Sequence, residues 1–269
     1  MARKSERRSA VAHGATAHYE DGRYYDQAYR RRRDDVRFYT GLAERSGGPV
    51  LELGAGTGRV ALEIAKAGIE VVGVESMRPM LDRAQERVAR LPRKTRDLIE
   101  FRHGDLERLR LRRRFPLVIA PFNVWMHLYT REQIERGFKT ANFHLGKNGR
   151  FVLDVLVPDP VNLARDPRKT YRGGTIPHPK DNARYRYSEV FHYDPDTQVQ
   201  TVWMQFEHPE TPSKSFTTPL TQRQFFPAEL RALLHYSGFR VEQHLGGFSR
   251  EPLGPRADSQ VIIARRGRK

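Results

Sequence analysis

The chain has 269 residues and no cysteine, and its 48 basic residues outnumber 32 acidic ones, which gives a formal net charge of +16 at pH 7. Without a thiol, a disulfide framework, a zinc–thiolate site and catalysis by a cysteine nucleophile are excluded. The N-terminal residues are basic but lack an apolar segment, and no stretch reaches the length of a membrane span. We therefore expect a cytoplasmic protein without a membrane partner.

The positive charge has two interpretations. A net charge of this size is typical of proteins that bind nucleic acid or anionic substrates. The basic residues are, however, spread from end to end, as in RRRR at 30–33 and RLRLRRR at 108–114. This spread favours an arginine-rich composition with solvated faces, so the charge by itself does not identify a site.

The first part of the chain changes character near position 19. Residues 1–18 are polar and charged without an apolar period, which predicts a disordered basic arm. A helical period then follows, which predicts one helix over 24–43 that ends at SGGP, 46–49. The apolar face of this predicted helix consists of Tyr25, Tyr29, Val36, Tyr39 and Ala43.

From position 49 onward, strand-like apolar runs alternate with amphipathic helical runs. The pattern predicts βαβ units and a parallel sheet with helices on both faces. Strands are expected at 49–53, 70–75, 99–105, 115–122 and 149–157, and helices at 57–68, 77–91 and 131–145.

The composition changes again at Pro158. Residues 158–222 are first rich in proline and charge and then alternate apolar with polar residues around DPDT, 194–197, which predicts a β-hairpin. A helix over 227–239 and strands over 240–245 and 259–266 follow. We therefore expect one domain made of 19–157 and 223–269, with a β-rich lobe inserted at 158–222.

The motif VLELGAGTGRV, 50–60, predicts a ligand site, because a glycine turn between a strand and a helix presents backbone N–H groups. Its spacing, Gly54, Gly56 and Gly58, differs by one residue from the dinucleotide motif. Glu52 is more informative, since a carboxylate in an apolar strand needs a partner. It would repel a pyrophosphate but suits an ammonium or sulfonium cation. The alternative is an ion pair with an arginine of the N-terminal helix.

Two further acids follow the next strands. Glu75 ends the second strand, where a carboxylate can accept both hydroxyls of a ribose. Asp105 follows the third and can accept from an exocyclic amine, with a helix N-cap as the alternative. Met77 and Met80 could contact a purine or be core residues, and for Met77 the core is favoured. Together the three acids describe a ligand with a cationic amino-acid end, a ribose and an adenine, which is S-adenosylmethionine.

With VVGVESMRPML, FRHGD and FPLVIAPFNVWMHL, the glycine motif makes positions 50–157 resemble the class I S-adenosylmethionine-dependent methyltransferases. This resemblance implies an α/β fold, a Rossmann-like doubly wound sheet of seven strands whose last strand is antiparallel, here with a β-rich insertion after strand five. More loosely, the tyrosine-rich N-terminal helix and the insertion look like small-molecule N-methyltransferases that act on glycine, sarcosine or amino sugars.

The resemblance also implies a cofactor site. Its methionine part would be lined by Glu52, Gly54, Ala55, Gly56 and Gly58, the ribose would be bound by Glu75, and the adenine would be framed by Gly104, Asp105 and Leu106. The predicted site is completed by Tyr25 as part of a lid, Ser76 beside Glu75, Met80, and Pro121 at the end of the fourth strand.

Methyl transfer is an in-line displacement at a sulfonium carbon, so the enzyme aligns the acceptor and removes a proton where needed. The resemblance places the acceptor at APFNVWMHLYT, 120–130. Many relatives have an aspartate inside the fourth strand, where this chain has Pro116, and the acid that binds Mg²⁺ in catechol-type enzymes is missing, so no metal is expected. Asn123 and His127 are the candidate catalytic residues, and they would share one face if this segment begins a helix. His127 is a candidate general base, with a packing role as the alternative.

The sequence thus predicts a metal-independent methyltransferase that acts on a nitrogen or oxygen of a small molecule, anionic ones included, as a monomer or homodimer. An RNA or peptide acceptor, motivated by the net charge, is the first alternative. A protein that binds S-adenosylmethionine without turnover is the second.

Overall fold

The computed structural model describes residues 11–178, 181 and 183–267. They divide into two compact units. The large unit contains residues 30–157 and 225–267, and the small unit contains residues 11–29 and the described residues of 158–224. The N-terminal segment up to Tyr29 therefore clusters with the inserted lobe, whereas the sequence placed residues 19–29 with the main domain.

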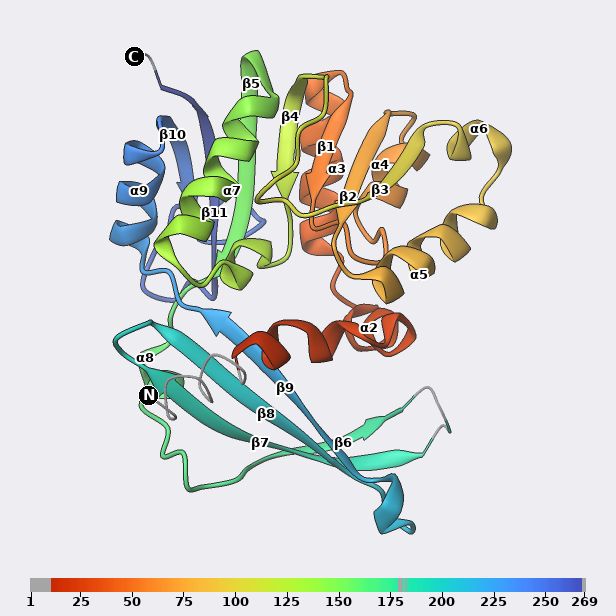
Figure 1. Cartoon of the computed structure of the whole chain (residues 1–269), viewed down its shortest axis with the longest axis vertical. Coiled ribbons are helices and arrows are strands. Elements are labelled where there is room, and N and C mark those ends of the chain that lie inside the picture. Colours follow the sequence, from red (N-terminus) through yellow and green to blue (C-terminus); the bar gives the residue numbers. More distant parts are fainter. Residues whose placement is uncertain (1–10, 179–180, 182, 268–269) are drawn as a thin grey trace. The chain divides into compact units, whose positions relative to one another are not determined.

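The large unit is built on one seven-stranded sheet with the order β10-β11-β5-β4-β1-β2-β3 (Figure 1). Neighbouring strands are parallel except that β11 is antiparallel to both β5 and β10. The predicted Rossmann-like doubly wound sheet is confirmed. Its strands are β1 (Val50–Leu53), β2 (Val71–Glu75), β3 (Ile99–His103), β4 (Phe115–Ala120), β5 (Leu145–Leu156), β10 (Phe239–Leu245) and β11 (Ser259–Arg266).

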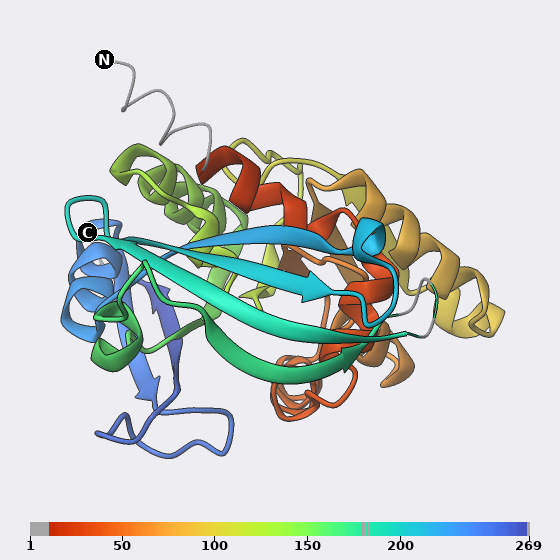
Figure 2. The ribbon, with the colours of Figure 1, turned by 90° about the horizontal axis from the view of Figure 1, so that it is seen from below.

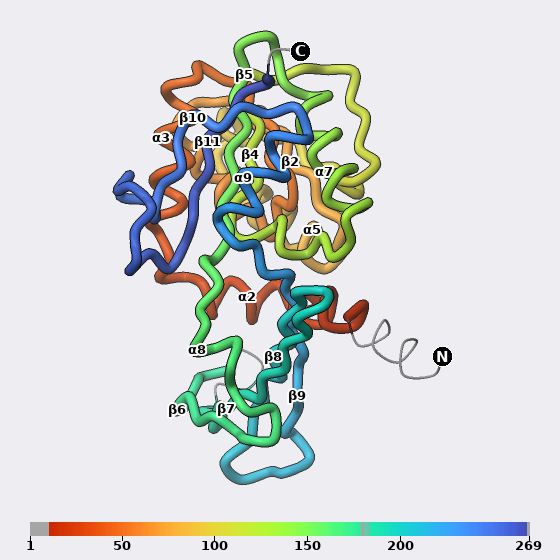
Figure 3. Tube along the Cα trace, turned by 90° about the vertical axis from the view of Figure 1, so that its left-hand side faces the viewer, coloured from red at the N-terminus to blue at the C-terminus, as the bar shows by residue number. Residues whose placement is uncertain are grey.

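Helices cover both faces of this sheet, with α3 on one side and α7 on the other (Figure 3). The division follows from the two-residue period of a strand. In β1, Leu51 and Leu53 pack in the cluster of α7 and α9, whereas Val50 packs in the cluster of α3 and α4. The helices are α3 (Asp34–Ser46), α4 (Ala61–Lys66), α5 (Arg78–Ala89), α6 (Arg93–Arg96), η2 (Val124–His127), α7 (Arg131–His144) and α9 (Pro227–Tyr236).

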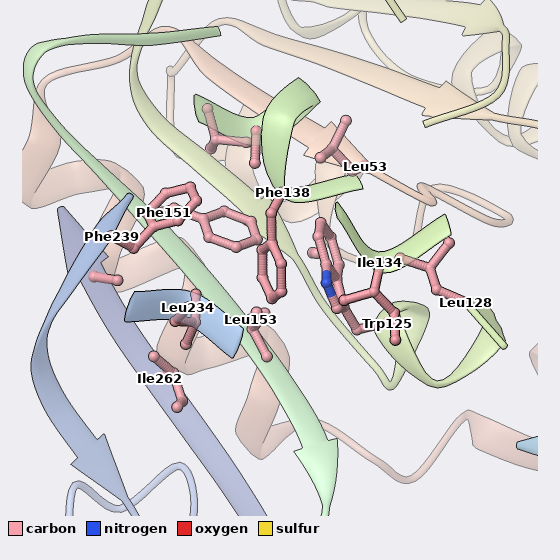
Figure 4. Close-up of a cluster of buried hydrophobic side chains, with 14 of the residues drawn as sticks. Leu53, Trp125, Leu128, Ile134, Phe138, Phe151, Leu153, Leu234, Phe239 and Ile262 are labelled. Atoms are coloured by element: carbon pink, nitrogen blue, oxygen red, sulfur yellow. The ribbon is translucent and has the colours of Figure 1, made fainter. Parts of the chain in front are cut away.

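An aromatic row anchors the segment that follows β4 (Figure 4). Trp125 of η2 is fully buried, and its ring centroid lies 5.2 Å from that of Phe138 on α7 and 5.1 Å from that of Phe151 on β5. Phe239 extends the row at 5.4 Å from Phe151. Large aromatic side chains contribute much of the core energy, so η2 is held firmly even though it is a single turn.

The small unit contains a four-stranded antiparallel sheet, whose strands run side by side in the order β6-β7-β8-β9 (Figure 2). The predicted hairpin is present as β7 and β8, which pair from Asp194↔Val199 outward. The elements are β6 (Tyr171–Pro177), β7 (Arg184–Asp194), β8 (Val199–Glu207), β9 (Phe216–Arg223), η1 (Ala17–Tyr19), α2 (Gly22–Tyr29), α8 (Pro160–Leu163) and η3 (Pro212–Lys214).

The N-terminal segment differs from two predictions. Residues 11–16 are helical and η1 follows, where disorder was predicted; residues 1–10 lie outside the described residues. His18 explains the order, because it is buried and its Nε2 lies 2.9 Å from the Tyr29 hydroxyl. The single helix predicted over 24–43 is also wrong. It is broken into α2 and α3, since four consecutive arginines repel one another and Asp34 and Asp35 favour a new helix N-terminus.

None of the helices in the described ranges combines the length and apolar character that a membrane span requires.

Candidate cofactor and acceptor site

The glycine turn between β1 and α4 requires glycine for two reasons. Gly54, Gly56 and Gly58 have φ angles of +70°, +57° and +76°, which disfavour residues with a Cβ. A Cβ at Gly54 would also lie only 2.5 Å from Cγ2 of Val124. The backbone N–H groups of Gly54 and Ala55 donate to the Val74 carbonyl at 2.8 and 2.9 Å. The turn is therefore fixed against β2 and closely approached by the segment after β4.

Glu52 is buried in the middle of β1. Its Oε2 has no hydrogen-bond partner among the described residues. Burial raises the pKa of its carboxyl group to about 8, although the Arg59 guanidinium opposes this rise. Among the described residues, no arginine of 24–43 forms the alternative ion pair with Glu52. Three of these arginines pair with other acids: Arg32 with Asp35, Arg33 with Glu63 and Arg37 with Asp34.

Glu75 joins the glycine turn to the start of α5. Its Oε2 accepts from the Gly56 N–H at 2.8 Å and its Oε1 from the Met77 N–H at 2.7 Å. Burial raises the pKa of Glu75, and these N–H donors oppose the rise. Each carboxylate oxygen can accept a second hydrogen bond, so the group remains able to bind a ribose. Ser76 is exposed, with its hydroxyl 3.5 Å from Glu75 Oε1.

The residues predicted to contact the adenine lie beside β2 and β3 in different environments. Met80 is almost fully buried, and a Cβ at Gly56 would lie 3.4 Å from its Cε. Met77, which the sequence favoured as a core residue, is instead a half-buried N-cap of α5. The helical period counted it on the apolar face, but it precedes the first helical turn.

The Gly104–Leu106 segment follows β3. The Gly104 N–H donates to the Glu75 carbonyl at 3.0 Å, which keeps this segment beside the end of β2. Leu106 is half-buried against the α7 face of the core. Asp105 is exposed, and its Oδ1 accepts from the Glu107 N–H at 2.8 Å. The Asp105 carboxylate therefore closes a local turn, and its second oxygen is left for a ligand.

The acceptor segment begins with Pro121, which is buried, and a left-handed turn. Phe122 and Asn123 have φ angles of 64° and 66°. Asn123 is buried, and its Oδ1 lacks a hydrogen-bond partner in the part of the chain that the structure describes. His127 is half-buried with its Nδ1 3.2 Å from the Tyr129 hydroxyl. The prediction that Asn123 and His127 share a helical face is wrong, because η2 is a 3₁₀ turn, in which residues four apart do not align.

Tyr25, the predicted lid residue, belongs to the small unit. It is buried in α2, with its ring centroid 4.8 Å from that of Tyr29 and 6.1 Å from that of His18. Within that unit it is a packing residue of an aromatic cluster.

A buried ion pair that the sequence did not suggest lies beside the glycine turn. Asp35 on α3 is fully buried and binds Arg59 through two hydrogen bonds of 2.9 and 2.5 Å. The guanidinium groups of Arg32 and Arg59 each lie 4.8 Å from the Phe122 ring centroid. Such contacts are attractive because the ring face is electron-rich. The position of Arg59 inside the glycine motif was the available signal.

Asp154 on β5 is the second acid that sequence reasoning missed. It is fully buried, and its Oδ1 accepts from the Tyr39 hydroxyl at 2.7 Å and from the Phe122 N–H at 2.8 Å. Burial raises its pKa to about 6, against the effect of these two donors. An acid within FVLDVL carries the same signal that singled out Glu52. In the described ranges, no three histidine or acidic side chains are arranged as metal ligands.

Comparisons with known proteins identify the family. A model of the methyltransferase domain matches residues 50–149. The solved structure of the CcbJ methyltransferase from Streptomyces caelestis is 30% identical, covers 88% of this chain and 89% of its own, and has a TM-score of 0.73. The chain belongs to the class I S-adenosylmethionine-dependent methyltransferases.

More distant structures share the fold of this methyltransferase. An S-adenosylmethionine-dependent methyltransferase from Clostridium acetobutylicum is 14% identical over 91% of this chain and 96% of its own, with a TM-score of 0.72. CalS10, an amino pentose methyltransferase from Micromonospora echinaspora, is 18% identical over 90% of this chain and 96% of its own, with a TM-score of 0.68. A search among proteins of curated function gave no match.

S-adenosylmethionine is the cofactor of this methyltransferase, and the residues at the ends of β1 and β2 fit it. Glu75 has acceptor capacity for ribose hydroxyls beyond the two backbone N–H groups that it binds. The orphaned oxygen of Glu52 is a buried acceptor that a cationic ligand would satisfy. The amino-acid end and the ribose thus have matching groups in the large unit.

Proposed function

We propose that this methyltransferase transfers the methyl group of S-adenosylmethionine to a nitrogen or oxygen atom of a small molecule, without a metal ion. The supporting observation is the extent of the similarity to CalS10, whose acceptor is an amino pentose. The large unit contains less than two thirds of the chain. A match over 90% of the whole chain must therefore include most of the β-rich insertion. The glycopeptide N-methyltransferase MtfA, 22% identical, also matches over 86% of the chain with a TM-score of 0.60.

The residues of the large unit have distinct roles in this proposal. When bound, S-adenosylmethionine supplies an electrophilic methyl group on a sulfonium. Glu52 faces the positive charge and Glu75 fixes the ribose, while the turn at Gly54 lets the methionine part approach the backbone. Asn123 orients the acceptor, and His127 takes the proton that the nitrogen or oxygen loses as the new bond to carbon forms. The carbon–sulfur electron pair leaves with the sulfur.

The experiment is an acceptor screen with His127 variants. The purified protein is incubated with S-adenosylmethionine and a panel of amines, amino sugars and hydroxy acids, and methylated products are detected by mass spectrometry. We expect at least one methylated small molecule, and a fall in kcat of about 100-fold for His127→Ala, the size typical of a lost general base. His235→Ala, an exposed histidine on α9, is the control and should retain full activity.

Two results would count against the proposal. S-adenosylhomocysteine binding without any methylated small molecule would favour a binding protein without turnover. Unchanged turnover of His127→Ala on an identified acceptor would remove His127 from the mechanism and leave the acceptor class standing.

An RNA or peptide acceptor is the second candidate, because the net charge of +16 favours an anionic polymer. Binding of such a polymer releases counterions, so activity would fall steeply as salt is raised. A small acceptor predicts activity that is nearly independent of salt.

A further inference from the structure

The turn that follows β4 is strained in two successive residues. Phe122 and Asn123 both have left-handed backbone angles, at φ values of 64° and 66°, and neither is glycine. This conformation costs conformational energy in a residue that has a Cβ, and such strain persists only where contacts with surrounding residues stabilise it. The turn therefore needs an identifiable restraint, and its neighbours supply one.

Asp154 is this restraint because of its place in the sheet. The last paired residues of β4 and β5 are Ala120 and Leu153, so Asp154 stands one residue beyond the end of β4, level with the turn. Its Oδ1 accepts from the Phe122 N–H at 2.8 Å, and its backbone carbonyl accepts from the Asn123 N–H at 3.2 Å. Both N–H groups of the strained turn are thus bound to one residue.

Tyr39 fixes the Asp154 side chain from α3. Its hydroxyl donates to the same Oδ1 at 2.7 Å, and both residues are fully buried. Burial and the nearby Asp154 carboxylate hold the pKa of Tyr39 well above its ordinary value, so the hydroxyl stays a donor. The hydrogen bond between Tyr39 and Asp154 is therefore shielded from solvent, whereas Phe122 at the turn is half-buried.

The other side of the turn is held by packing. Val124 is in such close approach to the glycine turn that a Cβ at Gly54 would clash with it, and Trp125 is buried in the aromatic row. Asn123 is the polar group between these contacts. Its Oδ1 is buried and has no partner within the described ranges, so it is an acceptor that an N–H or O–H of a ligand would satisfy.

We propose that Asp154, fixed by Tyr39, is a positioning residue that keeps the Phe122–Asn123 turn left-handed and so presents the Asn123 amide to an N–H or O–H of the methyl acceptor. The part that concerns the acceptor rests on the proposed function. The part that concerns the turn does not, because it can be measured on the protein with cofactor alone.

The first test measures hydrogen exchange at the Phe122 and Asn123 amides together with the affinity for S-adenosylhomocysteine. In Asp154→Ala we expect exchange of the Phe122 amide, which loses its acceptor, to accelerate at least ~10-fold, and exchange of the Asn123 amide, which keeps the backbone carbonyl of residue 154, to accelerate less. Affinity for S-adenosylhomocysteine should change by less than about 3-fold, a small effect on the scale where tenfold is 1.4 kcal/mol. Asp154→Asn keeps an acceptor oxygen and should restore most of the protection. Tyr39→Phe should give exchange rates between those of the wild type and Asp154→Ala. It replaces Asp154→Ala in this test if that variant does not fold.

Gln260→Ala is the control for the general effect of removing a buried polar side chain. Gln260 is also fully buried, on the neighbouring β11, and donates to the Phe225 carbonyl at 2.6 Å. It should lower stability without a selective effect on the turn. Equal exchange of the two amides in Asp154→Ala and Gln260→Ala would overturn the restraint.

The second test uses the acceptor kinetics. Misplacement of an aligned group by a fraction of an ångström lowers turnover, and we expect Asp154→Ala to reduce kcat by about 100-fold with little change in KM for S-adenosylmethionine. Asn123→Gly removes the amide without adding backbone strain and should raise KM for the acceptor by about 5- to 10-fold, the value of one hydrogen bond. Wild-type kinetics in both variants would overturn the inference and the orienting role of Asn123, while methyl transfer to a small molecule would still stand. Faster exchange at the turn in Asp154→Ala, together with no methylated small molecule from the wild-type protein, would support the restraint by Asp154 and rule out the proposed class of acceptor.

Discussion

The carboxyl group of Glu52 is buried in β1, where the loss of hydration disfavours its charged form. Its pKa rises to about 8 because water is lost, and the Arg59 guanidinium compensates only in part. A side chain whose folded-state pKa lies above its ordinary value binds protons on folding, so the stability it contributes is lost as pH rises toward 8. This loss of stability is accounted for if Glu52 faces the cationic cofactor, as we propose, because the ligand would then supply the partner that Oε2 lacks.

The residue-scale prediction from Glu52 concerns the affinity for S-adenosylmethionine. Because the carboxylate forms as pH rises through about 8, its attraction to the sulfonium increases, and the dissociation constant should fall over this interval. S-adenosylhomocysteine, a neutral thioether, should show a smaller change. Isothermal titration calorimetry at pH values on either side of 8 measures both.

Glu52→Gln is the control, because any pH dependence that comes from titration of the ligand itself is the same for this variant and the wild type. We expect this variant to bind S-adenosylmethionine more weakly at high pH, to lose the excess pH dependence, and to lose less stability than the wild type as pH rises toward 8. An identical pH dependence of affinity in the two proteins would show that Glu52 does not face the cation.

A second residue-scale prediction separates backbone strain from crowding in the glycine turn. Gly54→Ala meets Val124 at 2.5 Å and has a φ of +70°, whereas Gly68→Ala has a φ of +84° and nothing within 4 Å of its Cβ. Both should lose about 1 kcal/mol of unfolding free energy from strain. Only Gly54→Ala should also lose cofactor binding. Equal cofactor affinity in the two variants would contradict the close approach of Val124.

At the scale of elements, the Asp35–Arg59 pair joins α3 to the segment that leads into α4. Arg59→Met removes both hydrogen bonds of the guanidinium and leaves the fully buried Asp35 carboxylate with Arg32 at 3.8 Å as its remaining cation, and we expect it to lower the unfolding free energy by about 3 kcal/mol. Urea denaturation measures this. Arg37→Ala is the matched control, since its pair with Asp34 is exposed on both sides and should contribute less than about 1 kcal/mol. A loss for Arg59→Met no larger than that of Arg37→Ala would mean that the buried pair does not hold α3.

Most elements of the large unit could be predicted from hydrophobic period alone, because most of its strands are short apolar runs and its longer helices each have one apolar face. The short helix α6, RKTR, has no apolar residue and was not predicted. The break at 30–33 could not be predicted, because the same period continues through α2 and α3 and only the charge of four adjacent arginines interrupts it. The candidate cofactor residues Glu52 and Glu75 could be singled out from the sequence, since each places an acid at a strand position that the pattern makes apolar. The partners of Asp154 could not, because Tyr39 and Phe122 are brought to it by tertiary packing.

At the scale of the whole molecule, the two compact units are built from different segments of the chain. The large unit contains the methyltransferase sheet, whereas the small unit joins the insertion to the N-terminal segment. Many of the basic side chains form ion pairs with acids that the fold brings beside them, among them Arg113 with Glu70 and Arg136 with Glu107. Paired and distributed charge of this kind favours solvated faces over one polyanion-binding surface.

The most direct measurement follows the destination of the methyl group. The protein is incubated with methyl-labelled S-adenosylmethionine and a cell extract, and the label is counted in the small-molecule filtrate and in the retained RNA and protein at low and high salt. We predict label in the filtrate, in amounts that hardly change with salt. With Asp154→Ala only a small fraction of this label should appear there. Label retained with RNA or protein, falling steeply as salt is raised, would contradict a small-molecule acceptor.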